Sequence, residues 1–308
     1  LSEESEAIFD MARDVAMTEI APFARDWEAD GAIPRALWPK LAELGFGALY
    51  VSEDIGGSNL SRLDATLVFE ALSMACPSVA AFLSIHNMCA KMIDTFGSDD
   101  LKARHLPEAV SMEKVFSYCL TEPGSGSDAA ALRTRAERTN EGWLLTGTKA
   151  FISGGGYSDA YIVMARTGGD GPKGISALIV EDGAEGLSFG GLEDKMGWRS
   201  QPTRQVQLDD CPVPAGARLP LCHGRPRGRP PEHRRLLAGC GATGDGPDAG
   251  LYGRASRLRS AHRPVSGLAV PAGRYGNRPV GRARLPAAGG METGHRRARC
   301  DQVLRHGQ

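Results

Sequence analysis

The residue types best suited to chemistry lie in one short segment, residues 118–128, which read Tyr-Cys-Leu-Thr-Glu-Pro-Gly-Ser-Gly-Ser-Asp. Gly124 and Gly126 have no side chain and allow a ligand to approach the backbone closely. Backbone N–H groups and short hydroxyl and carboxylate side chains can direct several hydrogen bonds at one polar group. Such a loop suits a polar heterocycle or a phosphate. Taken alone, however, the segment is explained more simply as a solvated Gly/Ser turn.

Two further motifs follow it along the chain. Residues 147–155 read Gly-Thr-Lys-Ala-Phe-Ile-Ser-Gly-Gly, and residues 197–203 read Gly-Trp-Arg-Ser-Gln-Pro-Thr. The seven Cys residues have irregular spacings and no C-x-x-C pair, which indicates reduced thiols and predicts neither a disulfide framework nor a zinc site. We therefore assign no metal ligands.

The elements that precede the first motif are predicted to be helices. Apolar residues recur at helical spacing, and polar caps stand where each run begins. The expected caps are Ser2, Ser61 or Asp64, and Ser98, and Gly45 is expected as a left-handed stop. Another helix is expected from about residue 78 to 96. Residues 1–110 are therefore expected to be nearly all helical.

Between residues 111 and 217 the pattern changes to short β-type runs separated by Gly-rich turns. The runs are 115–120, 143–146, 150–153, 161–164, 175–180 and 206–208. We therefore predict an α+β multidomain protein, in which an N-terminal all-α domain (1–110) precedes a small antiparallel β-sandwich or barrel domain (111–217). This order alone does not name a reaction.

The charge is divided sharply along the chain. Residues 1–217 hold 18 Lys and Arg against 32 Asp and Glu, whereas residues 218–308 hold 18 Arg, no Lys and five Asp and Glu. The second segment also has no Ile, Phe or Trp but is rich in Gly and Pro. Two compositions this different are unexpected in one domain.

The three motifs, in this order and spacing, resemble the middle domain of acyl-CoA dehydrogenases. The helical part is similar to the N-terminal domain of the same family. That similarity rests on residues 44–47 (Leu-Gly-Phe-Gly), 54–58 (Asp-Ile-Gly-Gly-Ser), 96–100 (Phe-Gly-Ser-Asp-Asp) and 106–107 (Leu-Pro). The resemblance covers essentially all of residues 1–217.

The resemblance implies FAD as the cofactor and an acyl-CoA as the substrate. The Leu120 backbone and the Thr121 hydroxyl would bond the pyrimidine end of the flavin, where negative charge builds on reduction. Phe151 would cover one face of the ring, where many members carry Trp. The Ser153 hydroxyl would reach the flavin N5 side, and Ser127 would face the pantetheine arm of CoA. The residues expected along FAD are Tyr118, Cys119, Leu120, Thr121, Glu122, Pro123, Gly124, Ser125, Gly126, Ser127, Phe151, Ile152 and Ser153.

Other residues refine this expectation. Residues 57–64 and 84–89 resemble the isobutyryl-CoA dehydrogenase branch in particular, which implies a short, α-branched acyl group. His86 could be read as a catalytic base, but the resemblance puts it in a packed helix, so a core histidine is the preferred interpretation. Trp198 and Arg199 are expected near the ring or in subunit contacts, although a surface Arg is the simpler interpretation of Arg199.

Family chemistry removes the α-proton with a Glu base while the β-hydrogen leaves as hydride to flavin N5, giving a 2-enoyl-CoA. Electrons then pass to an electron-transfer flavoprotein, and intact members form homotetramers. The resemblance implies a bacterial cytoplasm or a mitochondrial matrix as the compartment. No membrane partner is expected, since no apolar run approaches the roughly 20 residues of a membrane span. The Glu belongs to a C-terminal helical bundle, so we expect it beyond residue 217 and assign no catalytic residue.

Residues 218–308 do not resemble that bundle. Read one base later, permitted codons for residues 222–239 can encode a sequence similar to the family's next helix, and residues 268–277 can encode Trp-Gln-Phe-Arg-Leu-Ala-Asp-Met-Ala-Thr. We therefore hypothesise a frameshift near residues 217–222. The expected bundle is then absent, replaced by a disordered tail, and the chain as written lacks the Glu and is inactive.

Alternatives for the same segment remain. A disordered Arg-rich tail could bind RNA or an anionic surface. The absence of Lys and of interleaved Phe and Tyr is unlike such segments, so a nucleic-acid partner is not favoured. An unfamiliar folded domain is a further option. A non-enzyme alternative for the whole chain is a truncated, non-catalytic ligand-binding remnant or a basic-tailed nucleic-acid-binding protein.

Overall fold

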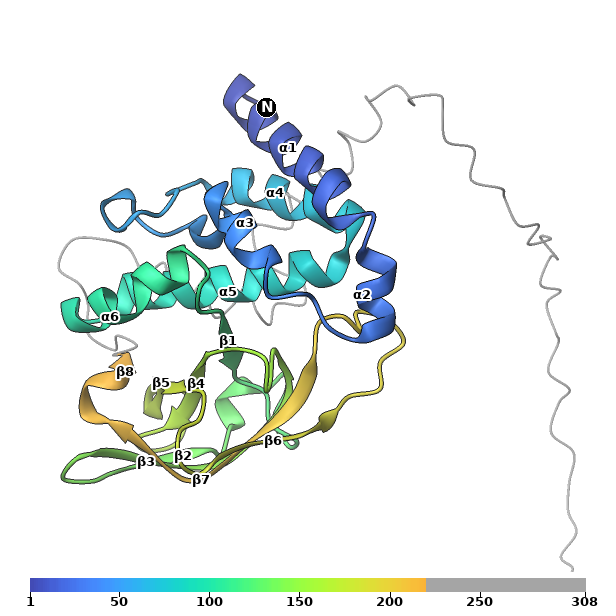
Figure 1. Cartoon of the computed structure of the whole chain (residues 1–308). Coiled ribbons are helices and arrows are strands. Elements are labelled where there is room, and N and C mark those ends of the chain that lie inside the picture. The colour runs from blue at the N-terminus through green and yellow to red at the C-terminus, as the bar shows by residue number, and fades with distance from the viewer. Residues whose placement is uncertain (220–308) are drawn as a thin grey trace, which may run out of the picture. The chain divides into compact units, whose positions relative to one another are not determined.

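The computed structural model describes residues 1–219, and the interpretations of residues 220–308 lie outside the described residues. The helical elements are α1 (Glu3–Val15), a π-helical turn (Ala16–Ile20), α2 (Ala24–Asp30), α3 (Leu37–Glu43), α4 (Arg62–Ala75), α5 (Pro77–Phe96) and α6 (Asp99–Val110). The strands are β1 (Phe116–Cys119), β2 (Arg135–Arg138), β3 (Gly142–Ser153), β4 (Ala160–Arg166), β5 (Ile175–Glu181), β6 (Leu187–Leu192), β7 (Thr203–Pro214) and β8 (Arg218–Leu219). The predicted order, helices first and strands after, is confirmed (Figure 1).

The helix starts follow from the predicted caps. The Ser2, Ser61 and Ser98 side chains each accept a hydrogen bond from a backbone N–H three residues later, at 3.1, 3.2 and 3.3 Å. Each such cap stabilises its helix by about 1 kcal/mol. Gly45 adopts a φ of 80° just after α3, as expected of a left-handed stop.

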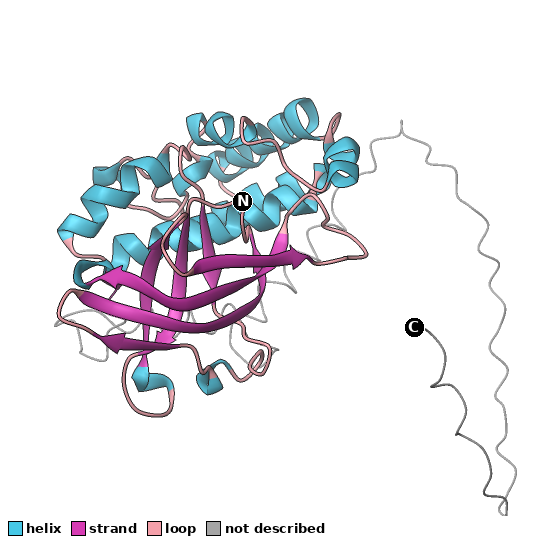
Figure 2. Cartoon of the chain, turned by 60° about the horizontal axis from the view of Figure 1, so that its bottom comes forward, coloured by secondary structure: helices cyan, strands magenta, loops and turns pink. Residues whose placement is uncertain are grey.

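Helix α5 belongs to two hydrophobic cores at once. Toward its N-terminus, Val79, Phe82 and Leu83 pack with α1, α3 and α4. Toward its C-terminus, Cys89 and Ile93 pack with the strands. Figure 2 shows the helices gathered on one side of the strands. Burying each large side chain contributes about 1.5–3 kcal/mol, so α5 is the main apolar link between the helices and the sheet.

Within residues 1–219 the strands form one eight-stranded sheet in the order β6-β7-β3-β2-β4-β5-β8, with β1 beside β4. Most pairs are antiparallel, as predicted, but β1 and β2 each pair with β4 in parallel. Apolar alternation reports which face of a strand is buried and not which strand lies beside it, so these two pairings could not be predicted.

His86 lies on α5 between the two cores and is fully buried. Its Nδ1 accepts a hydrogen bond from the Phe116 N–H at 3.1 Å, so Nε2 carries the proton and donates to the Ala109 carbonyl at 2.9 Å. Burial lowers the pKa of His86 to about 4, which keeps the ring neutral. The prediction of a core histidine is confirmed.

Helix α6 ends at Val110 and β1 begins at Phe116. Because α5 packs into both cores, contacts continue across this change, and the domain limits at residues 110 and 217 stay predictions. None of the helices within residues 1–219 has the length and apolar character needed to cross a lipid bilayer.

Candidate functional site

The fold brings the three motifs together. The loop after β1 meets the end of β3, where the Ala150 N–H donates to the Thr121 carbonyl at 2.8 Å. The Gly154 N–H donates to the Pro202 carbonyl at 2.7 Å, and Ser153 pairs with Thr203 across β3 and β7. Segments 118–128, 147–155 and 197–203 therefore form one continuous structure.

The first loop is tightly folded at its base and open at its tip. Glu122 and Ser125 exchange backbone hydrogen bonds of 2.9 and 3.1 Å, and the Ser125 hydroxyl donates to the Asp128 carbonyl at 2.6 Å. Pro123, Gly124, Gly126 and Ser127 are exposed. A Cβ added at Gly124 or Gly126 would meet no described atom within 4 Å. Within residues 1–219, no atom fills the space directly beside these two glycines, which leaves room for a ligand against the backbone.

A buried ion pair lies behind the loop. The Lys149 ammonium, whose side chain is fully buried, donates to the Leu120 carbonyl at 3.1 Å and to a Glu122 carboxylate oxygen at 2.8 Å. The Glu122 carboxylate also accepts from the Arg133 and Thr134 N–H groups at 2.6 and 2.9 Å. Burial alone would raise the pKa of Glu122, but these hydrogen bonds outweigh it and lower the pKa to about 2. Glu122 is therefore directed into the protein and not toward the open side of the loop.

Phe151 is placed in an unusual way. Its backbone has a φ of 58°, and its side chain is 64% exposed between the buried residues Ala150 and Ile152. The register of β3 against β7 shifts between Lys149 and Ile152, and this irregularity turns Phe151 outward. A bulky residue in the left-handed region costs of order 1–3 kcal/mol. Strain and an exposed aromatic ring at the same residue indicate a binding surface, since neither stabilises the fold.

The third motif is held in place by two charged side chains. The Lys195 ammonium donates to the Trp198 and Gln201 carbonyls at 2.7 and 2.5 Å, and to the Thr203 hydroxyl at 2.8 Å. The Glu28 carboxylate of α2 accepts from the Arg199 and Ser200 N–H groups at 2.8 and 3.0 Å. Burial would raise the pKa of Glu28, but the hydrogen bonds lower it.

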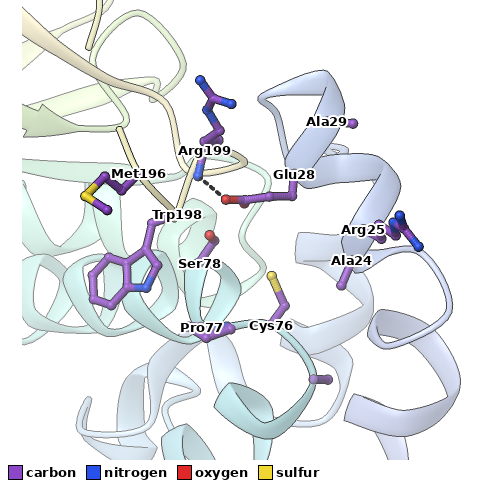
Figure 3. Close-up of a pocket in the computed structure, with 11 residues that line it drawn as sticks. Ala24, Arg25, Glu28, Ala29, Cys76, Pro77, Ser78, Met196, Trp198 and Arg199 are labelled. Carbon is purple, nitrogen blue, oxygen red and sulfur yellow. Dashed lines mark hydrogen bonds between the residues drawn. The ribbon is translucent and has the colours of Figure 1, made fainter. Parts of the chain in front are cut away.

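A cavity of about 640 Å³ lies where this loop meets the helices (Figure 3). Its walls come from α2, from the junction of α4 and α5, and from the loop that carries Trp198. It is lined by Ala24, Arg25, Glu28, Ala29, Ala75, Cys76, Pro77, Ser78, Met196, Trp198 and Arg199. Trp198 is 53% exposed, while Arg199 is on the surface and pairs with Asp194 at 2.7 Å.

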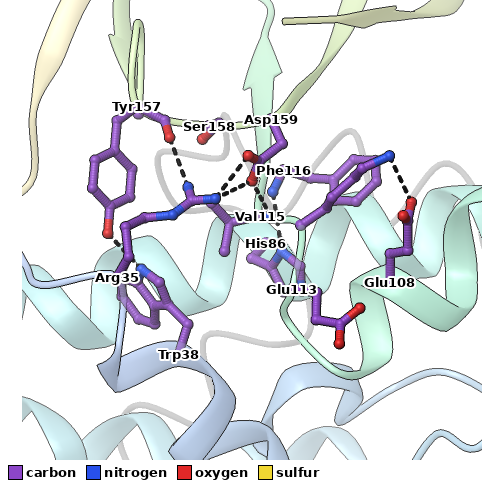
Figure 4. A network of polar contacts seen from close by, with 12 residues as sticks. Arg35, Trp38, His86, Glu108, Glu113, Val115, Phe116, Tyr157, Ser158 and Asp159 are labelled. Atoms are coloured by element: carbon purple, nitrogen blue, oxygen red, sulfur yellow. Dashed lines mark hydrogen bonds and ion pairs between the residues drawn. The ribbon is translucent and has the colours of Figure 1, made fainter.

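A second set of polar contacts joins the helices to the sheet (Figure 4). The Arg35 guanidinium donates to both Asp159 carboxylate oxygens at 2.7 and 2.5 Å, and Asp159 also accepts from the Val115 N–H at 2.8 Å. The Trp38 indole donates to the Tyr157 hydroxyl at 2.6 Å. These contacts hold the turn between β3 and β4, which follows Ser153 directly.

The predicted site residues fall into two groups. Thr121, Pro123, Gly124, Gly126, Ser127, Phe151 and Ser153 are exposed or half-buried, as are Tyr118 and Leu120. Cys119, Glu122, Ser125 and Ile152 are buried. Burial raises the pKa of Cys119 to about 12, so its thiol stays protonated. Side chains of the second group support the loop and do not line its open side.

Sequence reasoning did not assign roles to Lys149, Lys195 and Glu28. Lys149 lies within the second motif, and Lys195 lies two residues before the third. A lysine in a strand with alternating burial, such as Lys149, could have indicated an internal ion pair. No signal in the sequence links Glu28 to Arg199, which lies 171 residues later. Within residues 1–219, no group of three or more His, Cys, Asp or Glu side chains is arranged to hold a metal ion.

Comparison with known proteins identifies the family of the chain. Residues 2–113 match the N-terminal domain of acyl-CoA dehydrogenases, and residues 117–211 match the middle domain. The mitochondrial isobutyryl-CoA dehydrogenases of Dictyostelium discoideum and Bos taurus are 53% and 52% identical over 217 and 219 residues. These alignments cover 70% and 71% of this chain and 52% and 53% of the relatives. The chain thus spans about half the length of these relatives.

A solved structure shows the same architecture. The glutaryl-CoA dehydrogenase of Mycobacterium smegmatis, in complex with FADH2, superposes with a TM-score of 0.68 at 26% identity. The superposition covers 73% of this chain and 57% of that one. Since the two domain matches together cover most of residues 1–219, the chain belongs to the acyl-CoA dehydrogenase family, of which it carries the N-terminal and middle domains.

Proposed function

We propose that residues 1–217 form the FAD- and acyl-CoA-binding part of an acyl-CoA dehydrogenase that acts on a short, branched acyl group. The observation that carries the proposal is Phe151, an exposed and strained aromatic residue beside a loop whose glycines border empty space. The names of the two isobutyryl-CoA dehydrogenases support the choice of acyl group.

The residues present fit a flavin. A planar ring needs an apolar surface to stack on and hydrogen-bond donors at its polar edge. Phe151 would supply the surface, while the Leu120 backbone and the Thr121 hydroxyl would supply donors. Tyr118, Cys119, Pro123 and the backbone of residues 124–127 would lie along the cofactor, with Glu122, Ser125 and Ile152 supporting from inside.

FAD, when bound, supplies the acceptor for the β-hydrogen of the acyl chain. The Leu120 and Thr121 groups would favour the negative charge that develops at the polar edge of the ring. The Ser153 hydroxyl would reach the opposite side, and Ser127 would hold the pantetheine arm of the substrate. Trp198 and Arg199 would lie near the ring or in subunit contacts.

The remaining assignments rest on the family. We propose an electron-transfer flavoprotein as the electron acceptor and a homotetramer as the assembly of intact members. The relatives' names support the mitochondrial matrix if the source is a eukaryote, and the bacterial cytoplasm is the counterpart otherwise.

We also propose that the chain as written turns over little or no substrate, because the sequence of residues 218–308 does not resemble the segment in which the family carries its Glu base. A frameshift near residues 217–222 accounts for this. Sequencing the gene across codons 210–230 tests the idea, which fails if no base change restores an uninterrupted family-like frame.

One preparation of the full chain tests the binding function. We expect a flavin absorption band after reconstitution with FAD, a change in its shape on adding isobutyryl-CoA, and little bleaching under anaerobic conditions. A colourless protein that binds RNA in a salt-sensitive way would instead support the Arg-rich tail as the functional part. Phe151→Ala is the matched variant, and an unchanged affinity for FAD in that variant would contradict the proposed site.

A further inference from the structure

We propose that the Lys149–Glu122 ion pair is a positioning device, which sets the Leu120–Thr121 peptide and the Thr121 hydroxyl for the cofactor. The inference rests on the proposed function, because it concerns the loop that would hold FAD. It adds two residues whose side chains act from behind the loop and do not touch the ligand.

Strand β3 holds three consecutive residues of the loop. The Lys149 ammonium bonds the Leu120 carbonyl and the Glu122 carboxylate, and the next residue, Ala150, bonds the Thr121 carbonyl through its N–H. The main chain of the loop is thus fixed at residues 120 and 121 and its side chain at residue 122. The position of Thr121 is determined by contacts on both sides of it.

Glu122 connects the ion pair to a third segment, residues 133–134. Its carboxylate accepts the Arg133 and Thr134 N–H groups, which precede β2. Gly147 allows this approach, because a Cβ at Gly147 would lie 2.5 Å from the Thr134 hydroxyl oxygen. Residues 147–149 therefore have two separate roles. Gly147 leaves room for the Thr134 side chain, and Lys149 supplies the ammonium that binds Leu120 and Glu122.

Stability alone does not explain a charged pair at this place. Removing two charges from water is costly, and replacing a buried ion pair by well-packed neutral residues is often neutral or stabilising. An ammonium bonded to the Leu120 carbonyl has an additional effect. It polarises the Leu120–Thr121 peptide and makes the Thr121 N–H a stronger donor, beside the Thr121 hydroxyl that the proposed function assigns to the cofactor. The charge is therefore useful to a ligand with an electron-rich edge.

The test compares variants of the full chain. Glu122→Gln with Lys149→Met removes both charges while keeping an oxygen for the Arg133 and Thr134 N–H groups. Lys173→Met makes the same change at an exposed lysine and serves as the control. Glu122→Asp keeps both charges but shortens the carboxylate, and it replaces the double variant if that one does not fold.

Three quantities are measured: thermal unfolding, hydrogen exchange of residues 118–125 in the flavin-free protein, and FAD affinity by titration. We expect the double variant to unfold near the wild-type temperature, while its loop exchanges about tenfold faster and binds FAD about tenfold more weakly, as loss of one charge-assisted hydrogen bond predicts. The control should match the wild type in all three.

The outcomes separate the inference from the function it rests on. Wild-type exchange in the double variant, or faster exchange with unchanged FAD affinity, would overturn the positioning role. A wild-type chain that binds no FAD would overturn the proposed function. Faster hydrogen exchange of the loop in the double variant would, even then, show that Lys149 and Glu122 hold the loop in position.

Discussion

Two lysine side chains in the described residues direct their ammonium groups at the backbone of the protein and not at solvent. Lys149 holds the loop after β1, and Lys195 holds the loop before β7. An ammonium has three donors and no acceptor, so it can join several carbonyls that would otherwise repel one another. Residues of this kind shape a site without entering it, which is why their chemistry is not evident from the motif alone.

The pH dependence of stability should carry a contribution from His86. Its pKa is lowered from 6.5 to about 4 in the folded protein, so the unfolded chain binds the proton first as the pH falls. The stabilisation is present above pH 6.5 and is lost between pH 6.5 and 4, by up to about 3 kcal/mol. Chemical denaturation at pH 7 and pH 5 should show this loss. In His86→Gln the slope of stability against pH should be smaller, and an equal slope would contradict the assignment.

The strain at Phe151 can be measured directly. Glycine adopts a positive φ without cost, whereas alanine does not, so Phe151→Gly should be more stable than Phe151→Ala by about 1 kcal/mol. Denaturant unfolding of the two variants gives this difference. FAD binding should weaken in both, because both lack the ring. Equal stability would mean that the backbone at this residue is not strained.

At the scale of elements, the sequence predicts those whose pattern of burial is regular. The caps at Ser2, Ser61 and Ser98 and the β5 run agree with the prediction, whereas the two predicted runs 143–146 and 150–153 belong to one continuous strand, β3. Helix α2 and strands β2, β6 and β8 are not predicted by the sequence. Helix α2 and β6 have no buried residue, β2 has one, and β8 has only two residues, so none has an apolar pattern to detect. The site motifs could be recognised by their order, but the contacts behind them depend on tertiary packing.

Helix α2 nevertheless matters, because Glu28 fixes the loop that carries Trp198. The pKa of Glu28 is lowered from 4.5, so its contribution is present above pH 4.5 and is lost as the pH falls below that value. Glu28→Gln should lower the free energy of unfolding by about 0.5–1 kcal/mol at pH 7, and the difference should shrink at pH 4.

Trypsin provides a local measurement for the same variant. Cleavage after Lys195 and Arg199 at neutral pH should be faster in Glu28→Gln than in the wild type. Asp26→Asn, an exposed change on the same helix, is the control and should leave cleavage unchanged. Equal cleavage in all three proteins would show that Glu28 does not hold the loop.

At the scale of the whole molecule, the contacts of Asp159 join helices and sheet on the side of the Phe151 motif. Asp159→Ala removes the partner of Arg35 and leaves the Val115 N–H without its acceptor. We expect the free energy of unfolding to fall by about 2 kcal/mol. Asp10→Ala, which breaks an exposed pair with Arg13, should change it by less than about 0.5 kcal/mol. Denaturation followed by circular dichroism and by fluorescence gives both values, and similar losses in the two variants would contradict the role of Asp159.

Helix α5 packs in both hydrophobic cores, and this affects how the chain folds during synthesis. The helical segments leave the ribosome before the strands, so Cys89, Ile93 and their neighbours are made before the residues that cover them. Until β4 and β5 emerge, half of α5 presents an apolar surface to any other nascent chain or chaperone nearby. Completion of the sheet is therefore the step that ends this exposure, and translation that stops within residues 111–160 would release a helical fragment prone to aggregate.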